Sequence, residues 1–256
     1  MPIFIDSHSH IYAEEFDLDR TAVVEKSVSA GVFKIYMPNV DSLSIPRMLE
    51  AEALYPGVCM PMMGLHPCYV KHNFQEELYE VEQWLARRKF AAIGEVGLDF
   101  YWDLTFRKQQ EESLGIQADL AVKYDLPLVI HCRNSIRETI DLLKSNWKGK
   151  VRGIFHCFSG NLEEAKEIIE MGFSLGIGGV ATFKNGGLDR VLPEIDLSKI
   201  VLETDSPYLA PVPFRGKRNE SSYIPLIAGK IASIKNVTVE EVALATTQNV
   251  NAIFKM

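Results

Sequence analysis

Short apolar runs alternate with longer amphipathic segments along this chain, and no other feature constrains the possible fold as strongly. The runs have the length of strands, and the segments between them have the length of helices. Strands that alternate with helices indicate a parallel sheet. The predicted strands cover residues 3–8, 33–38, 58–66, 91–98, 126–131, 151–156, 173–178 and 200–204.

The predicted helices fill most of the intervals between these strands. Ser159-Gly160-Asn161 offers an N-cap for one of them, and Gly172 marks its end. We expect one more helix after Asn219 and a helical C-terminal segment, residues 238–256. The predicted helices before Asn219 cover residues 18–30, 76–88, 106–123, 136–147 and 162–171.

Polar residues stand at the ends of six predicted strands, which favours a barrel over an open doubly wound sheet. In a barrel these ends meet at one rim, whereas in an open sheet several would lie too far apart to cooperate. A chain of 256 residues without a long linker suits one such domain. We therefore predict an α/β fold, a TIM-like (β/α)8 barrel, with residues 1–256 forming a single domain.

Composition narrows the class of protein. The net charge of −7 argues against a broad electrostatic clamp for nucleic acid, although it leaves room for local cations. No apolar stretch reaches the roughly 18 residues of a membrane span, no signal peptide is evident, and the four cysteines form no CxxC pair. We therefore expect a cytoplasmic monomer that does not bind membranes.

His8 and His10 follow the first predicted strand with one residue between them. Residues two apart in an extended segment project to the same face, so both imidazoles aim at one point. Further imidazoles and carboxylates lie in or end four other predicted strands, and a barrel places them at the same rim. Any one of them could merely cap a helix or accept a hydrogen bond, but the joint set favours a metal site. The predicted ligands are His8, His10, Glu95, His131, His156 and Asp205.

The chemistry of these ligands narrows the metal. Four imidazoles and two carboxylates without a thiolate suit Zn, Mn, Fe or Ni, and suit Mg less because of the nitrogens. Six protein ligands are too many for one tetrahedral ion but fit two divalent ions about 3.5–4 Å apart. One carboxylate then bridges the ions, and Glu95 is the natural bridge because its strand is near the middle of the ring. A water between two such ions becomes a hydroxide nucleophile at neutral pH, so the predicted site is that of a hydrolase.

Glu203 and Asp205 alternate along the last predicted strand, so both carboxylates point to the same side. Asp205 is the better ligand because it is nearer the strand end, and Glu203 is expected to orient a ligand histidine from beneath the site. His66 ends the third predicted strand and is a candidate to bind the scissile phosphate and take part in catalysis. The alternative for His66 is a packing histidine.

Three cations are candidates to bind a substrate phosphate. Arg133 follows a predicted ligand by two residues and offers a bidentate fork, or else a salt bridge on the rim. Arg215 and Lys217 lie in the densest basic run of the chain, just after the last predicted strand, where a loop would overhang the metals. Tyr101 and Trp102 follow the fourth predicted strand and could either stack on nucleobases or pack beneath loops.

Six segments, in order along the chain, contain these residues together with their neighbours. They are Asp6-Ser7-His8-Ser9-His10, Gly64-Leu65-His66-Pro67, Gly94-Glu95-Val96-Gly97-Leu98-Asp99, His131-Cys132-Arg133, Phe155-His156-Cys157-Phe158-Ser159 and Glu203-Thr204-Asp205-Ser206-Pro207-Tyr208-Leu209, with a continuation through residues 210–220. These segments resemble the successive motifs of the TatD family of metal-dependent deoxyribonucleases, which is similar in fold to the amidohydrolase superfamily. The resemblance covers nearly the whole chain.

The resemblance implies 3′-to-5′ exonuclease activity on DNA, with Mg often the supplied ion. Many dinuclear amidohydrolases use a carboxylated lysine as the bridge, whereas the fourth predicted strand offers Glu95 and no lysine, which favours a phosphodiesterase. The chain departs from the family pattern at Ser221, where the pattern has a proline, and this makes the loop less rigid. By resemblance, one metal would be held by His8, His10, Glu95 and Asp205, and the other by Glu95, His131 and His156.

Together these observations predict a phosphodiesterase that acts on DNA or RNA strand ends through a metal-bound hydroxide. Asp205 would take a proton from the attacking water, with Glu95 and His66 completing the catalytic set. The same hydroxide could attack carbon, so the alternative is an ester or amide hydrolase, for example one acting on an aminoacyl-tRNA ester or a small lactone. A non-catalytic metal-binding or nucleic-acid-binding barrel is a third class, which the complete ligand set disfavours.

Overall fold

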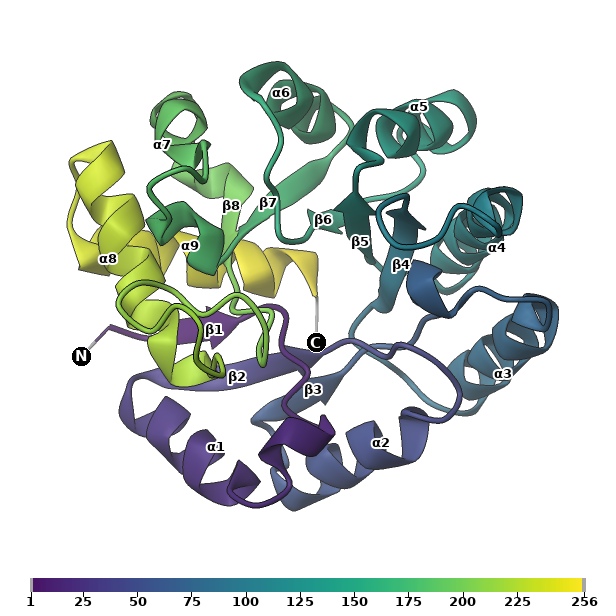
Figure 1. The fold of residues 1–256 in the computed structure, drawn as a ribbon, viewed down its shortest axis with the longest axis horizontal. Coiled ribbons are helices and arrows are strands. Elements are labelled where there is room, and N and C mark those ends of the chain that lie inside the picture. Colours follow the sequence, from purple (N-terminus) through teal and green to yellow (C-terminus); the bar gives the residue numbers. More distant parts are fainter. Residues whose placement is uncertain (1, 255–256) are drawn as a thin grey trace.

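Eight parallel strands form two hydrogen-bonded ladders, β1-β2-β3 and β4-β5-β6-β7-β8, in the computed structural model, which describes residues 2–254. Backbone hydrogen bonds span both seams between the ladders: Gly94 N donates to Met63 O over 3.0 Å, and Ser7 N donates to Leu202 O over 2.9 Å. The strands therefore stand side by side in a ring (Figure 1). Their bounds are β1 Phe4–Asp6, β2 Val32–Met37, β3 Cys59–Pro61, β4 Ile93–Asp99, β5 Leu128–Arg133, β6 Gly153–Phe155, β7 Phe173–Ile177 and β8 Ile200–Leu202.

Most helices lie around the outside of this ring, and the last helix crosses behind it (Figure 1). Asn161 caps α6 as predicted, since its side chain accepts hydrogen bonds from the backbone of Glu163 and Glu164. The helices α2 and α7 were not predicted, although Pro46 stands in the first turn of α2, where its missing N–H costs nothing. The helix bounds are α1 Arg20–Ser29, α2 Ile45–Leu54, α3 Phe74–Arg87, α4 Arg107–Tyr124, α5 Ile136–Trp147, α6 Leu162–Glu170, α7 Leu188–Val191, α8 Ile224–Lys235 and α9 Val239–Ile253.

Several strand ladders are shorter than predicted. The third strand was expected over residues 58–66, but β3 leaves the ladder with β2 after Pro61. Beyond Pro61 the chain forms backbone hydrogen bonds with the start of β4 instead: Met63 N donates to Ala92 O, just before β4, over 3.1 Å. Likewise β8 ends at Leu202, since Thr204 N donates to the carboxylate of Asp6 instead of to a strand. The polar residues after these strands are therefore held by specific contacts and not by the ladder.

Two separate apolar clusters result from the alternation of side chains along the strands. The larger cluster packs between the strands and the helices, and the smaller one fills the inside of the ring. The smaller cluster takes Ile5 from β1, Val129 from β5 and Val201 from β8, and it also contains Val250 and Phe254 from the end of the chain. The predicted C-terminal helix is thus confirmed as α9, within the described residues, and its end packs into the interior of the ring.

The helix α9 also contacts the amino-terminal ends of the strands. Asn249 donates hydrogen bonds to Leu197 O and Ile200 O at the start of β8, and Thr247 donates to Ile3 O just before β1. The opposite end of the ring, where the strands finish, is left for the predicted site. The structure confirms the predicted α/β, TIM-barrel-like architecture, with two ladders joined at their seams. None of the described helices is long and apolar enough to cross a membrane.

Candidate metal centre

The six predicted ligands meet at the carboxyl ends of the strands, with Glu95 at their centre. Glu95 lies within β4 and is almost fully buried. Its Oε1 is 2.8 Å from both His131 Nδ1 and His156 Nε2. Its Oε2 is 3.0 Å from His8 Nε2 and 3.4 Å from His10 Nε2. The two oxygens of one carboxylate thus face two different pairs of histidines, which is the geometry expected of a bridge.

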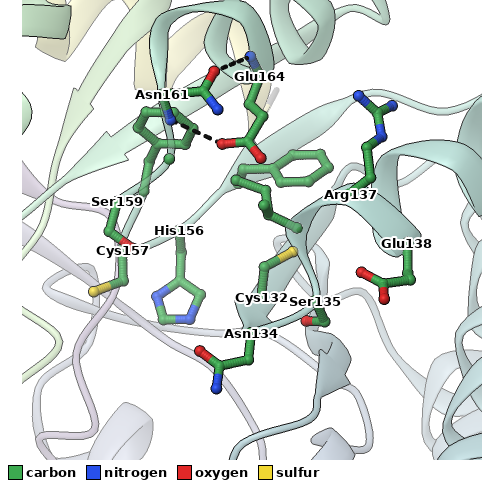
Figure 2. Close-up of a pocket in the computed structure, with 14 residues that line it drawn as sticks. Cys132, Asn134, Ser135, Arg137, Glu138, His156, Cys157, Ser159, Asn161 and Glu164 are labelled. Atoms are coloured by element: carbon green, nitrogen blue, oxygen red, sulfur yellow. Dashed lines mark hydrogen bonds between the residues drawn. The ribbon is translucent and has the colours of Figure 1, made fainter.

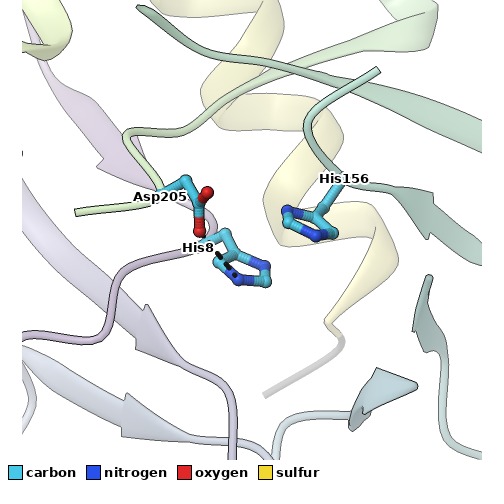
Figure 3. A group of neighbouring side chains, drawn as sticks. All are labelled: His8, His156 and Asp205. Carbon is cyan, nitrogen blue, oxygen red and sulfur yellow. Dashed lines mark ion pairs between the residues drawn. The ribbon is translucent and has the colours of Figure 1, made fainter. Parts of the chain in front are cut away.

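Asp205 completes the side of the cluster that faces His8 and His10. Its Oδ1 lies 3.6 Å from His8 Nε2 and 3.7 Å from His10 Nε2. The backbone of Asp205 has a φ of 57°, a left-handed conformation that aspartate tolerates better than most residues. Its N–H donates to His8 O over 2.9 Å, which ties the end of β8 to the end of β1. Figure 3 shows the Asp205 carboxylate beside the ring of His8, which stacks on the ring of His156.

Several buried polar atoms of this cluster have no hydrogen-bond partner among the described residues. They include both ring nitrogens of His8, Oε2 of Glu95 and Nδ1 of His156. His8 Nε2 and Glu95 Oε2 are 3.0 Å apart, but they lack hydrogen-bond geometry. Leaving such atoms unpaired is costly, so the arrangement fits a cation that supplies the missing partner. The donor atoms, imidazole nitrogens and carboxylate oxygens, suit a divalent transition metal.

Three groups of these side chains have ligand atoms close enough to hold one ion each. Two of the groups share His8, and two share Glu95. The groups do not follow the ligand division implied by the family resemblance, because His156 falls with His8 and His66 falls with His131. The groups are His8, His156 and Asp205; His8, His10 and Glu95; and His66, Glu95 and His131.

For His10, His131 and His66, the hydrogen bond on the far side of the ring decides which nitrogen faces the cluster. Tyr12 donates its hydroxyl proton to Pro38 O over 2.6 Å, so its oxygen must accept from His10 Nδ1, 3.3 Å away. The proton on His10 is thereby placed on Nδ1, and Nε2 is left to bind a metal. Tyr12 was not singled out in the sequence, where a tyrosine two residues after a histidine carries no signal.

A carboxylate stands on the far side of His131 and of His156, but only His131 is hydrogen-bonded to it. His131 Nε2 lies 3.0 Å from Asp99 Oδ2, so Nδ1 faces Glu95. His156 Nδ1 lies 3.7 Å from Glu203 Oε1, too far for a hydrogen bond, so the orienting role of Glu203 stays a prediction. Glu203 also accepts a hydrogen bond from Cys157 N. A Cβ on Gly176 would lie 2.2 Å from Glu203 Oε2, so only glycine leaves room for this buried carboxylate.

His66 has the opposite arrangement. Cys68 N donates to His66 Nδ1 over 3.1 Å, so the proton of the neutral ring must be on Nε2. That nitrogen lies 3.3 Å from Glu95 Oε1 and therefore points into the cluster as a hydrogen-bond donor. A protonated nitrogen cannot bind a metal, although His66 is close enough to do so. The geometry favours the predicted role of His66 toward an anionic substrate.

Burial and charge set the ionisation of this cluster. Burial would raise the pKa of Glu95, but the surrounding imidazoles, His156 foremost, outweigh it and hold that pKa well below its usual range. Burial lowers the pKa of His8 and of His66. At His10, burial is outweighed by hydrogen bonds to carboxylates, which raise the pKa to about 9. An ion bound at Nε2 of His10 would displace the proton there, while Nδ1 keeps the one shared with the tyrosine.

Residues outside the predicted site hold it in place. Asn39 follows β2, is fully buried, and its carbonyl accepts from Glu95 N over 3.0 Å. Gln117 of α4 pairs with both backbone groups of Leu65, next to His66, at 2.8 and 3.1 Å. Sequence reasoning missed both residues, because a single buried amide leaves no periodic pattern.

Asp6 was also missed, although it begins one of the quoted motifs. It is fully buried and accepts hydrogen bonds from the backbone N–H and the hydroxyl of Thr204, at 3.0 and 2.6 Å. His8 N also donates to it over 3.2 Å. The carboxylate therefore joins the segment that carries His8 to the segment that carries Asp205. The signal that could have identified Asp6 was its position at the start of the Asp6-Ser7-His8-Ser9-His10 motif.

The predicted substrate-binding cations lie on exposed parts of the rim. Arg133 ends β5, and its guanidinium lies 3.8 Å from the ring centre of Tyr101 and 5.1 Å from that of Trp102. No described carboxylate forms an ion pair with it, so its N–H fork is available. Arg215 stacks on Phe183 at 4.4 Å, and Lys217 is exposed without an ion pair to any described residue. The neighbouring Arg218 is engaged, because it forms a bidentate pair with Asp19.

A ring of parallel strands with imidazoles and carboxylates converging at its carboxyl end defines the class of metal-dependent hydrolases. The model of the TatD related DNase family matches residues 5–255, and the chain belongs to this family. It is 37% identical over 255 residues to the uncharacterized metal-dependent hydrolase YabD of Bacillus subtilis, a match that covers 99% of this chain and 100% of that protein.

Two further matches agree with this assignment. The chain is 30% identical over 254 residues to the 3′-5′ ssDNA/RNA exonuclease TatD of Pantoea vagans, covering 96% of this chain and 97% of that protein. The crystal structure of YjjV, a TatD homolog from Escherichia coli K12, has a TM-score of 0.92 at 29% identity and covers 99% of this chain and 98% of that one. The family and the hydrolase class predicted from the sequence are confirmed.

Proposed function

We propose that this protein is a metal-dependent 3′-to-5′ exonuclease that removes nucleotides from the ends of single-stranded DNA or RNA. The observation that carries the proposal is the convergence of histidines and carboxylates on Glu95, in a chain that belongs to the TatD related DNase family. The relative from Pantoea vagans is named for this activity. Membership of this family favours cleavage of phosphodiester bonds over the ester or amide alternative.

Two divalent ions are proposed, one on each side of Glu95. Zn, Mn, Fe and Ni suit the nitrogen-rich set, and the family resemblance adds Mg. When bound, the ions would polarise the phosphodiester and lower the pKa of the attacking water. One would be held by His8, His10, Asp205 and Oε2 of Glu95, and the other by His131, His156 and Oε1 of Glu95.

The remaining side chains would handle the proton and the phosphate. Asp205 is partly open to solvent and would accept the proton of the attacking water. His66 would donate its Nε2 proton in a hydrogen bond to a non-bridging phosphate oxygen. Arg133, held flat against Tyr101, would bind the next phosphate through its N–H fork, and Arg215 and Lys217 would hold the strand from the other side of the rim.

We further propose that residues 1–256 form a single catalytic domain that acts as a monomer. The family match over residues 5–255 supports the single domain. All proposed ligands come from one chain and converge within it, so the site needs no second subunit. Sedimentation of the metal-loaded protein should give the mass of one chain, and a stable dimer would contradict this part of the proposal.

The first test compares exonuclease activity across metals and variants. We expect chelation to abolish release of nucleotides from a 5′-labelled single strand, and Mn, Mg, Zn or Co to restore it. His131→Ala and Asp205→Ala should each lower kcat/KM by about 10²–10⁴-fold. His66→Ala should lower it by about 10²–10³-fold while metal content stays unchanged, because His66 is a donor and not a ligand.

Matched controls are available on the surface. His72→Ala and Asp189→Ala remove the same side-chain types from exposed positions, and both should retain full activity. Full metal-dependent turnover by His131→Ala would refute the site. Product ladders that shorten from the 5′ end, or turnover of an aminoacyl ester but not of an oligonucleotide, would refute the proposed reaction.

A further inference from the structure

A cavity of about 450 Å³ lies beside the metal centre, between the loops that follow β5 and β6. His156 is part of its wall and is also a proposed metal ligand, so the cavity begins one side chain away from the proposed reaction (Figure 2). The volume falls in the range of about 300–1,000 Å³ that small-molecule sites occupy. None of the residues assigned to phosphate binding lines it.

The lining combines an apolar floor with a polar mouth. Phe155 and Phe158 are buried at the floor, and Ile136 adds an aliphatic side chain. At the mouth stand Asn134 and Ser159, both exposed, and neither side chain has a hydrogen-bond partner among the described residues. A flat apolar body with a hydrogen-bonding edge would fit such a lining, and a nucleobase has this character.

The charges of the lining disfavour a phosphate. Its one guanidinium, that of Arg137, is held by Glu167 at 2.7 Å and by Asp141 at 2.7 Å. Glu138 and Glu164 add two carboxylates to the walls, as Figure 2 shows. Glu138 is paired with Arg107 at 3.7 Å, but the lining offers a phosphate no free cation, whereas the free cations lie elsewhere on the rim. The site therefore suits the neutral part of a nucleotide.

We propose that this cavity binds the base of a nucleotide that adjoins the scissile phosphodiester. The proposal rests on the proposed nuclease function and adds a specificity determinant to it. A base can enter the cavity only after it leaves the helical stack, so a paired end must first be opened at a cost. The cavity would thus select single-stranded ends by geometry and distinguish a normal nucleotide from an abasic one.

The test uses single strands that carry an abasic site at the terminal or at the penultimate 3′ position. We expect the metal-loaded wild-type protein to cleave the intact strand with a kcat/KM about ten-fold above that of one of the two abasic strands. Ser159→Trp, which fills the mouth of the cavity, should reduce this ratio to near one. Asn134→Ala is a smaller second variant, expected to lower the same ratio, and thermal melts confirm that both fold.

Ser145→Trp is the matched control. Ser145 is exposed near the C-terminal end of α5, whereas the cavity is lined by the N-terminal end of that helix. It should keep the wild-type ratio. Equal cleavage of intact and abasic strands by the wild type, or an unchanged ratio in Ser159→Trp, would overturn the cavity proposal. Bis(p-nitrophenyl) phosphate, a phosphodiester without a base, distinguishes failure of the cavity proposal from failure of the nuclease proposal. If the protein hydrolyses this compound but cleaves intact and abasic strands equally, the cavity proposal alone is refuted. If it hydrolyses no phosphodiester, the nuclease function is refuted as well.

Discussion

His10 and His66 both contact Glu95, yet they differ in the nitrogen that carries the proton. The hydroxyl oxygen of Tyr12 accepts a hydrogen bond from Nδ1 of His10, whereas Cys68 N donates to Nδ1 of His66. The first arrangement leaves a lone pair for a metal, and the second leaves a donor for an anion. A choice between ligand and donor is therefore made by atoms on the outer side of each ring.

The hydroxyl of Tyr12 can be removed without changing the shape of the site. Tyr12→Phe should lower metal affinity by about 10–100-fold, because His10 loses the acceptor that holds its ring and its proton. Metal titration of the chelated protein, followed by mass spectrometry of the bound ion, measures the effect. Tyr55→Phe is the control, since among residues 2–254 its hydroxyl bonds only to Thr21, at the surface. Equal affinities in the two variants would contradict the role of Tyr12.

At the scale of the element, α4 supports the site through polar side chains on its buried face. Gln110 and Gln117 are seven residues apart and so lie on one side of the helix. Gln110 pairs with both backbone groups of Asp99, just as Gln117 does with Leu65. These amides satisfy backbone groups of Asp99, the last residue of β4, and of Leu65, which lies beyond the end of β3. The helix thus holds the segments that carry Asp99 and His66.

The helix α9 closes the opposite end of the ring. Phe254, directly after α9, stacks on Tyr36 with ring centres 4.1 Å apart. Phe254→Ala should lower the free energy of unfolding by about 3–5 kcal/mol, because it leaves a cavity in the interior. Leu244→Ala, on the exposed side of the same helix, should change it little. Urea unfolding measures both, and similar values for the two variants would show that this end of the chain does not support the ring.

The contact between α5 and α6 predicts a pH dependence. Hydrogen bonds from Arg137 and Lys144 lower the pKa of Glu167 to about 2. A carboxylate with a lowered pKa stabilises the fold above its unfolded pKa of about 4.3, and this contribution is lost as pH falls toward about 2. The difference in unfolding free energy between wild type and Glu167→Gln should therefore be constant above about pH 5 and shrink below pH 4. Glu240→Gln, an exposed control without a described ion pair, should show no such change.

At the scale of the whole molecule, the proposed metals should stabilise the fold. The ligands come from strands that are far apart in sequence, so an unfolded chain cannot hold them together. A free metal concentration of 100 times the Kd stabilises by about 2.7 kcal/mol, which corresponds to a Tm increase of about 5–10 °C for a chain of this size. Glu95→Gln should lose most of this increase. An equal increase in both proteins would show that the metal binds elsewhere.

The sequence by itself determined the α/β class, the order of the strands and the residues that converge on Glu95. Each of these depends on a local pattern: an apolar run of strand length, a polar residue at its end, or two histidines on one face of an extended segment. The four-residue helix α7 and the ends of the ladders were missed, because tertiary contacts and not local periodicity define them. The ten-residue helix α2 was also missed, although it buries Ile45, Met48 and Ala51 at helical spacing.

Only the tertiary structure decided which nitrogen of each histidine faces the cluster, how Asn39 and Gln117 hold the strand ends, and where α9 packs. The cavity between the loops after β5 and β6 belongs to the same group. Most of these join residues far apart along the chain, although His10 and Tyr12, and likewise His66 and Cys68, are only two residues apart. Each is a single contact, and a single contact leaves no repeat in the sequence. The physical reason is that hydrogen-bond direction and cavity shape depend on how several elements are placed relative to one another. That placement is set only when the strands and helices pack together.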